Sequence, residues 1–276
     1  YGAVMAMILP PAIALLSKRN RPILTKVMLA IATGVIALGL VFSFTRAAWV
    51  SLVVVAAIYA AMRFGFKLKT LLGIGVIMLA LVWTSKDSII IELQRNKQDS
   101  SDNLTEHVES ISNVSSDDSN LERLNRWSCA IALFKERPIT GWGPGTYQFV
   151  YAPFQKSDLK TIISTNNADG GNAHSEYLGP LAEQGVLGAL FMILLIWWAS
   201  KIGFRLWRNM KNLDDRNLAV SVYLGLMSYF IHGVLNNYLD TDKANAPFWG
   251  FLVLLVVLDI ELKQRNDSRL LKSATQ

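Results

Sequence analysis

"LTKVMLAIATGVIALGLVFSF" runs from Leu24 to Phe44 and carries a single charged residue, Lys26. A hydrocarbon core of about 30 Å needs roughly 20 apolar residues to be crossed by one helix. The stretch is therefore long enough to span a bilayer. A basic turn precedes it and Arg46 follows it closely, so charged residues mark both of its ends. This pattern predicts a membrane-spanning helix.

The rest of the chain repeats the pattern. Of 276 residues, 52% are hydrophobic and only 17% are charged, which is unusual for a soluble domain. We predict an all-α integral membrane protein with about seven transmembrane helices. Four lie in residues 1–84 and three in 178–262, and the further apolar runs are about 1–16, 47–62, 68–84, 178–199, 218–239 and 245–261. Because the chain begins at Tyr1 inside an apolar run, we expect it to be the C-terminal part of a longer protein.

Basic residues predict the orientation. Short loops rich in Lys and Arg stay in the cytoplasm. With seven alternating spans, one side collects sixteen basic and five acidic residues, and the other collects eleven basic and sixteen acidic. The first side, which includes the tail 263–276, is therefore predicted to be cytoplasmic. Membrane topology accounts for the positive net charge, so no nucleic-acid partner is expected.

A large loop, 85–177, falls on the opposite, non-cytoplasmic side. Residues 85–118 are rich in Ser, Asp and Asn, which predicts a mobile segment. An amphipathic helix is predicted over 119–137, where "SNLE" resembles a capping box. Its apolar stripe suits the outer membrane surface, and the stripe consists of Leu121, Leu124, Trp127, Ile131 and Phe134.

Arginines on this side are candidates for phosphate binding, because guanidinium forms bidentate hydrogen bonds with phosphate oxygens. Arg123 and Arg126 lie off the apolar stripe, and Arg46 lies at the outer end of the second span. The ordinary alternatives are a solvated polar face with a Glu122–Arg126 pair at i,i+4, and a snorkelling side chain at Arg46.

His174 opens "HSEYLGPLAEQGVLG", just before the fifth span. A histidine can take a proton from a hydroxyl nucleophile near neutral pH. Glu176 and Glu183 can orient it, or all three can be ordinary interfacial residues. His232 and Asp240 lie at the outer end of the sixth span and are further candidates.

Metal and cofactor signals are weak. Asp240 and Asp242 form a D-x-D, which holds metals in many sugar-nucleotide enzymes, but a cytosolic nucleotide would not reach this side. Cys129 is the only cysteine, which excludes an internal disulfide and a multi-cysteine metal site. We therefore expect no metal and no cofactor.

Four stretches together resemble the O-antigen ligase and polymerase superfamily of bacterial envelope glycosyltransferases. The ligases carry a histidine, then Asn, Ser or Gln, nine residues, Gly, two residues, then Gly, Thr or Tyr. Here His174, Ser175, Gly185 and Gly188 fit without departure. "ERLNRWSCAIALFKERPITGWGPGTY" resembles the family's loop helix, "SFTRAAW" its S-x-x-R segment, and "HGVLNNYLDTDKANAPFWGFLVLL" its last outer turn and helix.

The resemblance implies a reaction. A glycan on undecaprenyl pyrophosphate would be moved to an acceptor hydroxyl, such as that of lipid A–core, at the periplasmic face of the inner membrane. The resemblance implies that no metal or nucleotide takes part. His174 would activate the acceptor, Arg46 and Arg123 or Arg126 would bind the pyrophosphate, and Asp240, His232 and Glu176 would support them.

Three other functions stay open at this point. A polymerase of the same superfamily, extending repeat units on the lipid carrier, would use the same residue types. A protein-directed oligosaccharyltransferase has a similar layout. A transporter belongs to another class and would place ionisable residues near the middle of the membrane.

Overall fold

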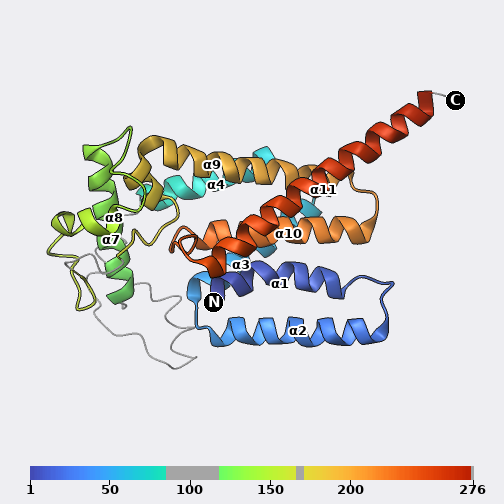
Figure 1. The fold of residues 1–276 in the computed structure, drawn as a ribbon, viewed down its shortest axis with the longest axis horizontal. Coiled ribbons are helices and arrows are strands. Elements are labelled where there is room, and N and C mark those ends of the chain that lie inside the picture. The colour runs from blue at the N-terminus through green and yellow to red at the C-terminus, as the bar shows by residue number, and fades with distance from the viewer. Residues whose placement is uncertain (85–117, 166–170, 275–276) are drawn as a thin grey trace. The chain divides into compact units, whose positions relative to one another are not determined.

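The computed structural model describes residues 1–84, 118–165 and 171–274 (Figure 1). Helices are the only regular elements in this part of the chain, which confirms the predicted all-α class. The chain divides into two compact units, one of residues 1–68, 195–232 and 239–276, the other of 69–194 and 233–238. The helices are α1 Gly2–Leu16, α2 Ile23–Phe42, α3 Arg46–Arg63, α4 Leu68–Thr84, α7 Asp118–Glu136, α8 Tyr147–Val150, η1 Ala152–Phe154, α9 Leu178–Asn209, α10 Leu213–His232 and α11 Asp242–Ala274.

Four of the described helices are long and apolar enough to cross a membrane. They are α2, α3, α9 and the Asp242–Asn266 part of α11. Gly2–Leu16 and Leu68–Ile77 are apolar but shorter. The predicted span at 218–239 falls on α10, which ends at His232 and is not among the four. The structure thus supports a multi-pass membrane protein, while the count of seven spans stays a prediction.

In the first unit, α10 is the central helix and packs against α1, α3 and α11. Nearly every residue from Ala219 to Phe230 is buried, so α10 is enclosed by protein on all sides. Gly225 allows α1 to approach closely, because a side chain there would overlap the carbonyl oxygen of Met7. Pro11 has no N–H to donate to the Met7 carbonyl, so α1 lacks one helical hydrogen bond at the point where α10 packs against it.

Polar contacts also join helices of this unit. The hydroxyl groups of Ser51 on α3 and Ser228 on α10 are buried and 3.0 Å apart. Arg205 Nε lies 2.6 Å from Asp259 Oδ1, and Lys263 Nζ lies 3.0 Å from Asp259 Oδ2. Asp259 is buried, and two cations from α9 and α11 neutralise it.

Figure 1 shows that α1, α3 and α11 begin at the end of this unit where α10 finishes. Lys243 Nζ donates to the Tyr1 hydroxyl at 3.1 Å and joins the first turns of α11 and α1. Arg46 begins α3, His232 ends α10, and Asp240 precedes α11. These three predicted site residues therefore belong to one end of the first unit.

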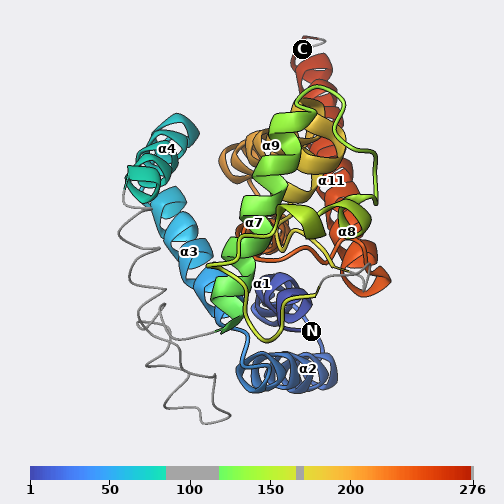
Figure 2. The same ribbon diagram turned by 90° about the vertical axis from the view of Figure 1, so that its left-hand side faces the viewer.

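The second unit is built around α7, with α8 beside it (Figure 2). Its core joins α7 to α8 and to the start of α9, through Cys129, Ala130, Leu133, Tyr147, Tyr151, Ala173 and Ala182. The stacked rings of Tyr147 and Tyr151 lie 5.4 Å apart, and the Tyr147 hydroxyl donates to the Arg126 carbonyl at 2.7 Å. The predicted mobile segment 85–118 lies, apart from its last residue, outside the described residues.

The face of α7 that packs into this core differs from the predicted apolar stripe. Glu122, Asn125, Arg126 and Cys129 are buried, whereas Ile131 of the stripe is 37% exposed. The alternative of a solvated face for Arg126 is therefore wrong, although the i,i+4 pair of Arg126 with Glu122 is present. The reason is that the neighbouring loop supplies polar partners, which a helical pattern alone does not reveal.

Candidate active site

His174 sits in the segment that leads into α9, with its backbone held from both sides. Its N–H donates to Asn172 Oδ1 at 3.0 Å, and its carbonyl accepts from Trp127 Nε1 of α7 at 3.3 Å. The φ angle is +47°, a left-handed conformation that few residues other than glycine adopt. Backbone strain of this kind concentrates at functional sites. The two hydrogen bonds thus hold the His174 backbone beside α7.

Ser175 and Glu176 fasten this segment to its surroundings. Ser175 Oγ accepts from the backbone N–H groups of Tyr177 and Leu178, at 3.3 and 3.4 Å, and so begins α9. Glu176 is buried, and its carboxylate accepts from the Tyr238 N–H at 2.7 Å. Its own N–H donates to the Gly233 carbonyl at 2.8 Å. Glu176 therefore anchors residues 233–238 next to the His174 segment.

Arg126 is one of two arginines on α7, and it is locked in a buried network. It is 4% exposed, and its Nε lies 2.5 Å from Glu122 Oε1. Its Nη2 donates to Thr165 Oγ1 at 2.9 Å, and its guanidinium lies 4.0 Å from the centre of the Tyr151 ring. Ser164 Oγ donates to the other oxygen of Glu122. The network ties α7 to the loop at 164–165 and neutralises the Arg126 charge locally.

Arg123, three residues earlier, is partly exposed. Its Nη1 donates to the uncharged side-chain oxygen of Asn120 at 2.9 Å. Of the two arginines, Arg123 is the one that a ligand can reach.

The electrostatics connect His174 to both arginines. Burial and, after it, the positive charges of Arg123 and Arg126 together lower the pKa of His174 to about 4, with Glu122 opposing them. The structure therefore brings His174, Arg123 and Arg126 together in one unit. It also follows that the imidazole is neutral at pH 7 and able to accept a proton.

Glu183 has a role that the sequence did not reveal. Its carboxylate accepts from the N–H groups of Gly145 and Tyr147, both at 2.9 Å, and so begins α8. Its backbone carbonyl accepts from the Gly143 N–H at 2.8 Å. Glu183 thereby holds the "GWGPG" turn against α9, across 36 residues of sequence from its partner Tyr147. No local pattern points to so distant a pair.

Gly185 makes this docking possible. Its φ and ψ are +66° and −156°, which interrupts the helical backbone of α9. The Val186 N–H beyond the break donates to the Pro138 carbonyl at 2.9 Å. A side chain at Gly185 would overlap the Ile139 carbonyl. The twelve residues from His174 to Gly185 thus connect the candidate base to the close contact between α9 and the Pro138–Ile139 backbone.

The remaining predicted residues, Arg46, His232 and Asp240, belong to the first unit. Arg46 is partly exposed, His232 is buried and Asp240 is exposed. Among the residues that the structure describes, no group of three His, Cys, Asp or Glu side chains is placed to hold a metal ion.

Comparison with known proteins gives one positive result. No curated protein matches the chain. A family model described as O-antigen ligase matches residues 29–193, which include most of α2, all of α3 and α7, His174 and the Gly185 break. Because the match covers more than half of the 276 residues, the chain belongs to the O-antigen ligase family.

Proposed function

We propose that this protein transfers a glycan from undecaprenyl pyrophosphate to an acceptor hydroxyl at the periplasmic face of the bacterial inner membrane. Membership of the family supports a membrane glycosyltransferase of the ligase or polymerase type. The observation that carries the proposal is the placement of His174, whose backbone is held from both sides and whose pKa is lowered, near two arginines of α7. A base next to fixed positive charge suits the displacement of an anionic leaving group by a hydroxyl.

In the proposed reaction, the acceptor oxygen attacks the anomeric carbon of the lipid-linked sugar. The bond between that carbon and the pyrophosphate oxygen breaks, and undecaprenyl pyrophosphate leaves with the bonding electrons. His174 takes the proton of the acceptor hydroxyl. Arg123 stabilises the negative charge that develops on the leaving oxygen. The transfer of one proton and one glycosyl group balances without an oxidant or a nucleotide.

Arg123 is proposed as the pyrophosphate contact on α7, and Arg126 as its support. A phosphate can approach Arg123 because that side chain is partly exposed. Arg126 is buried and already paired with Glu122, so a second anion would have to displace a close ion pair. Arg126 nevertheless contributes positive charge near His174.

Four further residues complete the proposal. Arg46 would make a second pyrophosphate contact at the start of α3. Asp240 and His232 would support the acceptor side. Glu176 would keep the His174 segment in place through its bond to the Tyr238 N–H at 2.7 Å.

Transfer is proposed to be independent of a divalent metal, with arginines supplying the positive charge that metals supply in many sugar-nucleotide enzymes. Purified protein treated with a chelator should keep its activity, and activity restored only by added Mg²⁺ or Mn²⁺ would contradict this.

A polymerase that extends repeat units on the lipid carrier is the second candidate, because family membership supports both types equally. Deletion of the gene in its host distinguishes a ligase from a polymerase. The surface glycan is resolved on gels and the lipid-linked saccharides are analysed. Loss of the surface ladder with long glycan on the carrier indicates a ligase, and single repeats on the carrier indicate a polymerase. An unchanged ladder and carrier pool, in a host without a paralogue, would contradict both and favour a transporter.

A further inference from the structure

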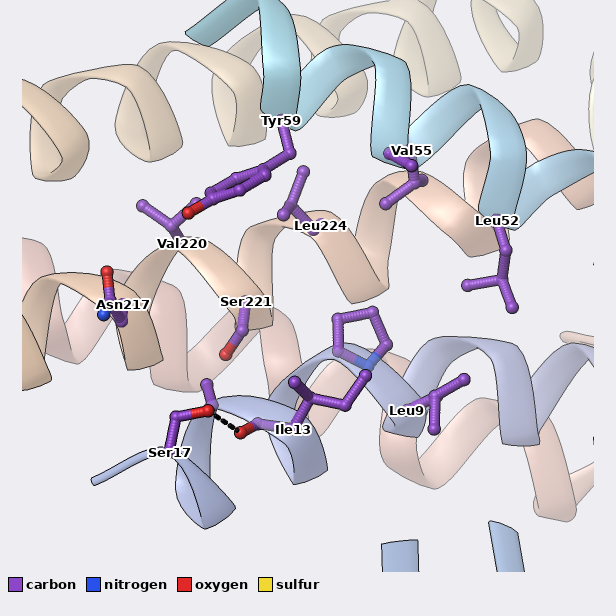
Figure 3. A pocket seen from close by; sticks show the side chains of 13 residues that line it. Leu9, Ile13, Ser17, Leu52, Val55, Tyr59, Asn217, Val220, Ser221 and Leu224 are labelled. Atoms are coloured by element: carbon purple, nitrogen blue, oxygen red, sulfur yellow. Dashed lines mark hydrogen bonds between the residues drawn. The ribbon is translucent and has the colours of Figure 1, made fainter. Parts of the chain in front are cut away.

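A groove of about 320 Å³ lies in the first unit, on the surfaces of α1, α3 and α10. Its walls are mainly aliphatic, with Leu9 and Ile13 from α1, Leu52 and Val55 from α3, and Leu224 from α10 (Figure 3). This volume falls within the usual range for bound small molecules, about 300–1,000 Å³. The groove does not include any residue of the candidate active site.

Of the helices that line the groove, α3 is long and apolar enough to cross a membrane, and α1 is apolar but shorter. Ile13 is 49% exposed and Tyr59 is 41% exposed, so the walls are accessible from outside. The solvent around such a surface is the hydrocarbon of the bilayer. An occupant that enters from there must have an apolar chain.

Polar side chains gather at one end of the groove, where Figure 3 shows Ser17, Tyr59 and Asn217 around the end opposite Leu9 and Leu52. The Ser17 hydroxyl donates to the Ile13 carbonyl at 2.8 Å and is already used. The Tyr59 hydroxyl and the Asn217 amide have no hydrogen-bond partner in the part of the chain that the structure describes. Two donors are therefore available to a ligand at this end.

Basic residues lie close in sequence to the residues at this end of the groove. The Nε atoms of Arg21 and Arg216 are buried without a hydrogen-bond partner among the described residues. Two acids are nearby in sequence, Asp214 and Asp215, and Asp215 lies 3.8 Å from Arg265. Lys18, Arg19 and Arg21 follow Ser17 in sequence. Arg63 lies one helical turn after Tyr59, and Arg216 directly precedes Asn217. The sequence around these residues is positive overall, which suits the binding of a phosphate.

We propose that the groove binds an anionic phospholipid, with one acyl chain between α1, α3 and α10 and the headgroup phosphate at the Tyr59 and Asn217 end. An apolar slot with hydrogen-bond donors and cations at one end matches the layout of such a lipid. The site does not depend on the glycan-transfer reaction, because none of its residues takes part in that reaction.

The test compares two lipids with the same acyl chains, phosphatidylglycerol and phosphatidylcholine. Purified protein in detergent is titrated with each, and bound lipid is counted by native mass spectrometry. Phosphatidylglycerol should bind about fivefold more tightly, the factor expected for one basic residue near the phosphate. The variant Ala56→Trp fills the groove and should lose this binding. Ala57→Trp is the matched control, because Ala57 is exposed on α3 but does not line the groove.

A second variant, Asn217→Asp, keeps the shape and adds negative charge at the polar end. It should weaken binding of phosphatidylglycerol more than binding of phosphatidylcholine, whose choline cation offsets its phosphate charge, and it tests the proposal even if Ala56→Trp fails to fold. Equal binding of both lipids to the wild type, or unchanged phosphatidylglycerol binding in the folded variants, would overturn the proposal. So would cross-linked dimers of Ile13→Cys, which would place a second copy of the chain in the groove.

Discussion

Burial and the nearby charges of Arg123 and Arg126 both lower the pKa of the His174 imidazole, and burial has the larger effect. We expect kcat/KM to be constant near neutral pH and to fall as the pH drops through the His174 pKa, about 4 in the free protein. The reason is that only the neutral ring accepts a proton. Arg123→Gln removes one positive charge, so the His174 pKa should rise and the acid limb should move to higher pH. The measurement is the pH profile of kcat/KM for both proteins.

Arg137→Gln is the matched control for that profile. Arg137 is exposed, and its guanidinium lies 4.0 Å from the centre of the Trp142 ring. Arg137 is not among the charges that shift the His174 pKa. The acid limb of the Arg137→Gln profile should therefore lie at the same pH as that of the wild type. An acid limb that does not move in Arg123→Gln would contradict the electrostatic link between α7 and His174.

Arg123 and Arg126 should respond differently to the same substitution. Arg126→Gln leaves Glu122 buried without its partner and should lower the free energy of unfolding by about 3–5 kcal/mol. Arg123→Gln should change it by less than about 0.5 kcal/mol but raise the KM for the donor about tenfold to a hundredfold, as expected for lost charge-assisted bonds. Thermal unfolding in detergent and donor titrations measure the two effects.

The double variant Glu122→Gln/Arg126→Met separates charge from shape in that experiment. It removes the buried pair as a whole, so stability should recover part of the loss seen in Arg126→Gln. If Arg126→Gln were as stable as the wild type and bound donor worse than Arg123→Gln, the assignment of the two arginines would be reversed.

At the scale of elements, Gly185 carries the connection between α9 and the turn that follows α7. Gly185→Ala should lower the free energy of unfolding by about 2 kcal/mol or more, because φ is +66° and a Cβ would overlap the Ile139 carbonyl. Gly34→Ala on α2 is the control, since a Cβ there meets no atom within 4 Å and alanine favours a helix. Equal stability of the two variants would show that the break at Gly185 is not required.

Sequence patterns predicted the helical class well and the elements in part. The apolar run at 24–44 became α2, because length and composition alone decide such a helix. The packed face of α7 was missed, since Glu122 and Arg126 are buried by Ser164 and Thr165, some 40 residues away. The Glu183 contacts with α8 were missed for the same reason. His174 and the arginines were named from their chemistry and from the family resemblance, and their proximity could be seen only in the fold.

At the scale of the whole molecule, the distribution of basic residues predicts which ends of the helices face the periplasm. Cysteines placed at exposed Asp240 and Arg19 test this with a membrane-impermeant maleimide. Asp240→Cys should react with the maleimide while the inner membrane is intact, and Arg19→Cys should react only after the membrane is disrupted. Cys129 gives little background, because it is fully buried and burial raises its pKa to about 11. Labelling in the reverse order would contradict the orientation.

The central claim is that His174 accepts the proton of the attacking hydroxyl. The most direct measurement is the rate of undecaprenyl pyrophosphate release by wild type and His174→Ala, at saturating lipid-linked donor and acceptor, with matched expression and unfolding temperature. We predict that kcat falls about a hundredfold to ten-thousandfold while donor binding is unchanged. A folded variant whose kcat stays within about threefold of the wild type would contradict the account, because general base catalysis contributes at least about a hundredfold.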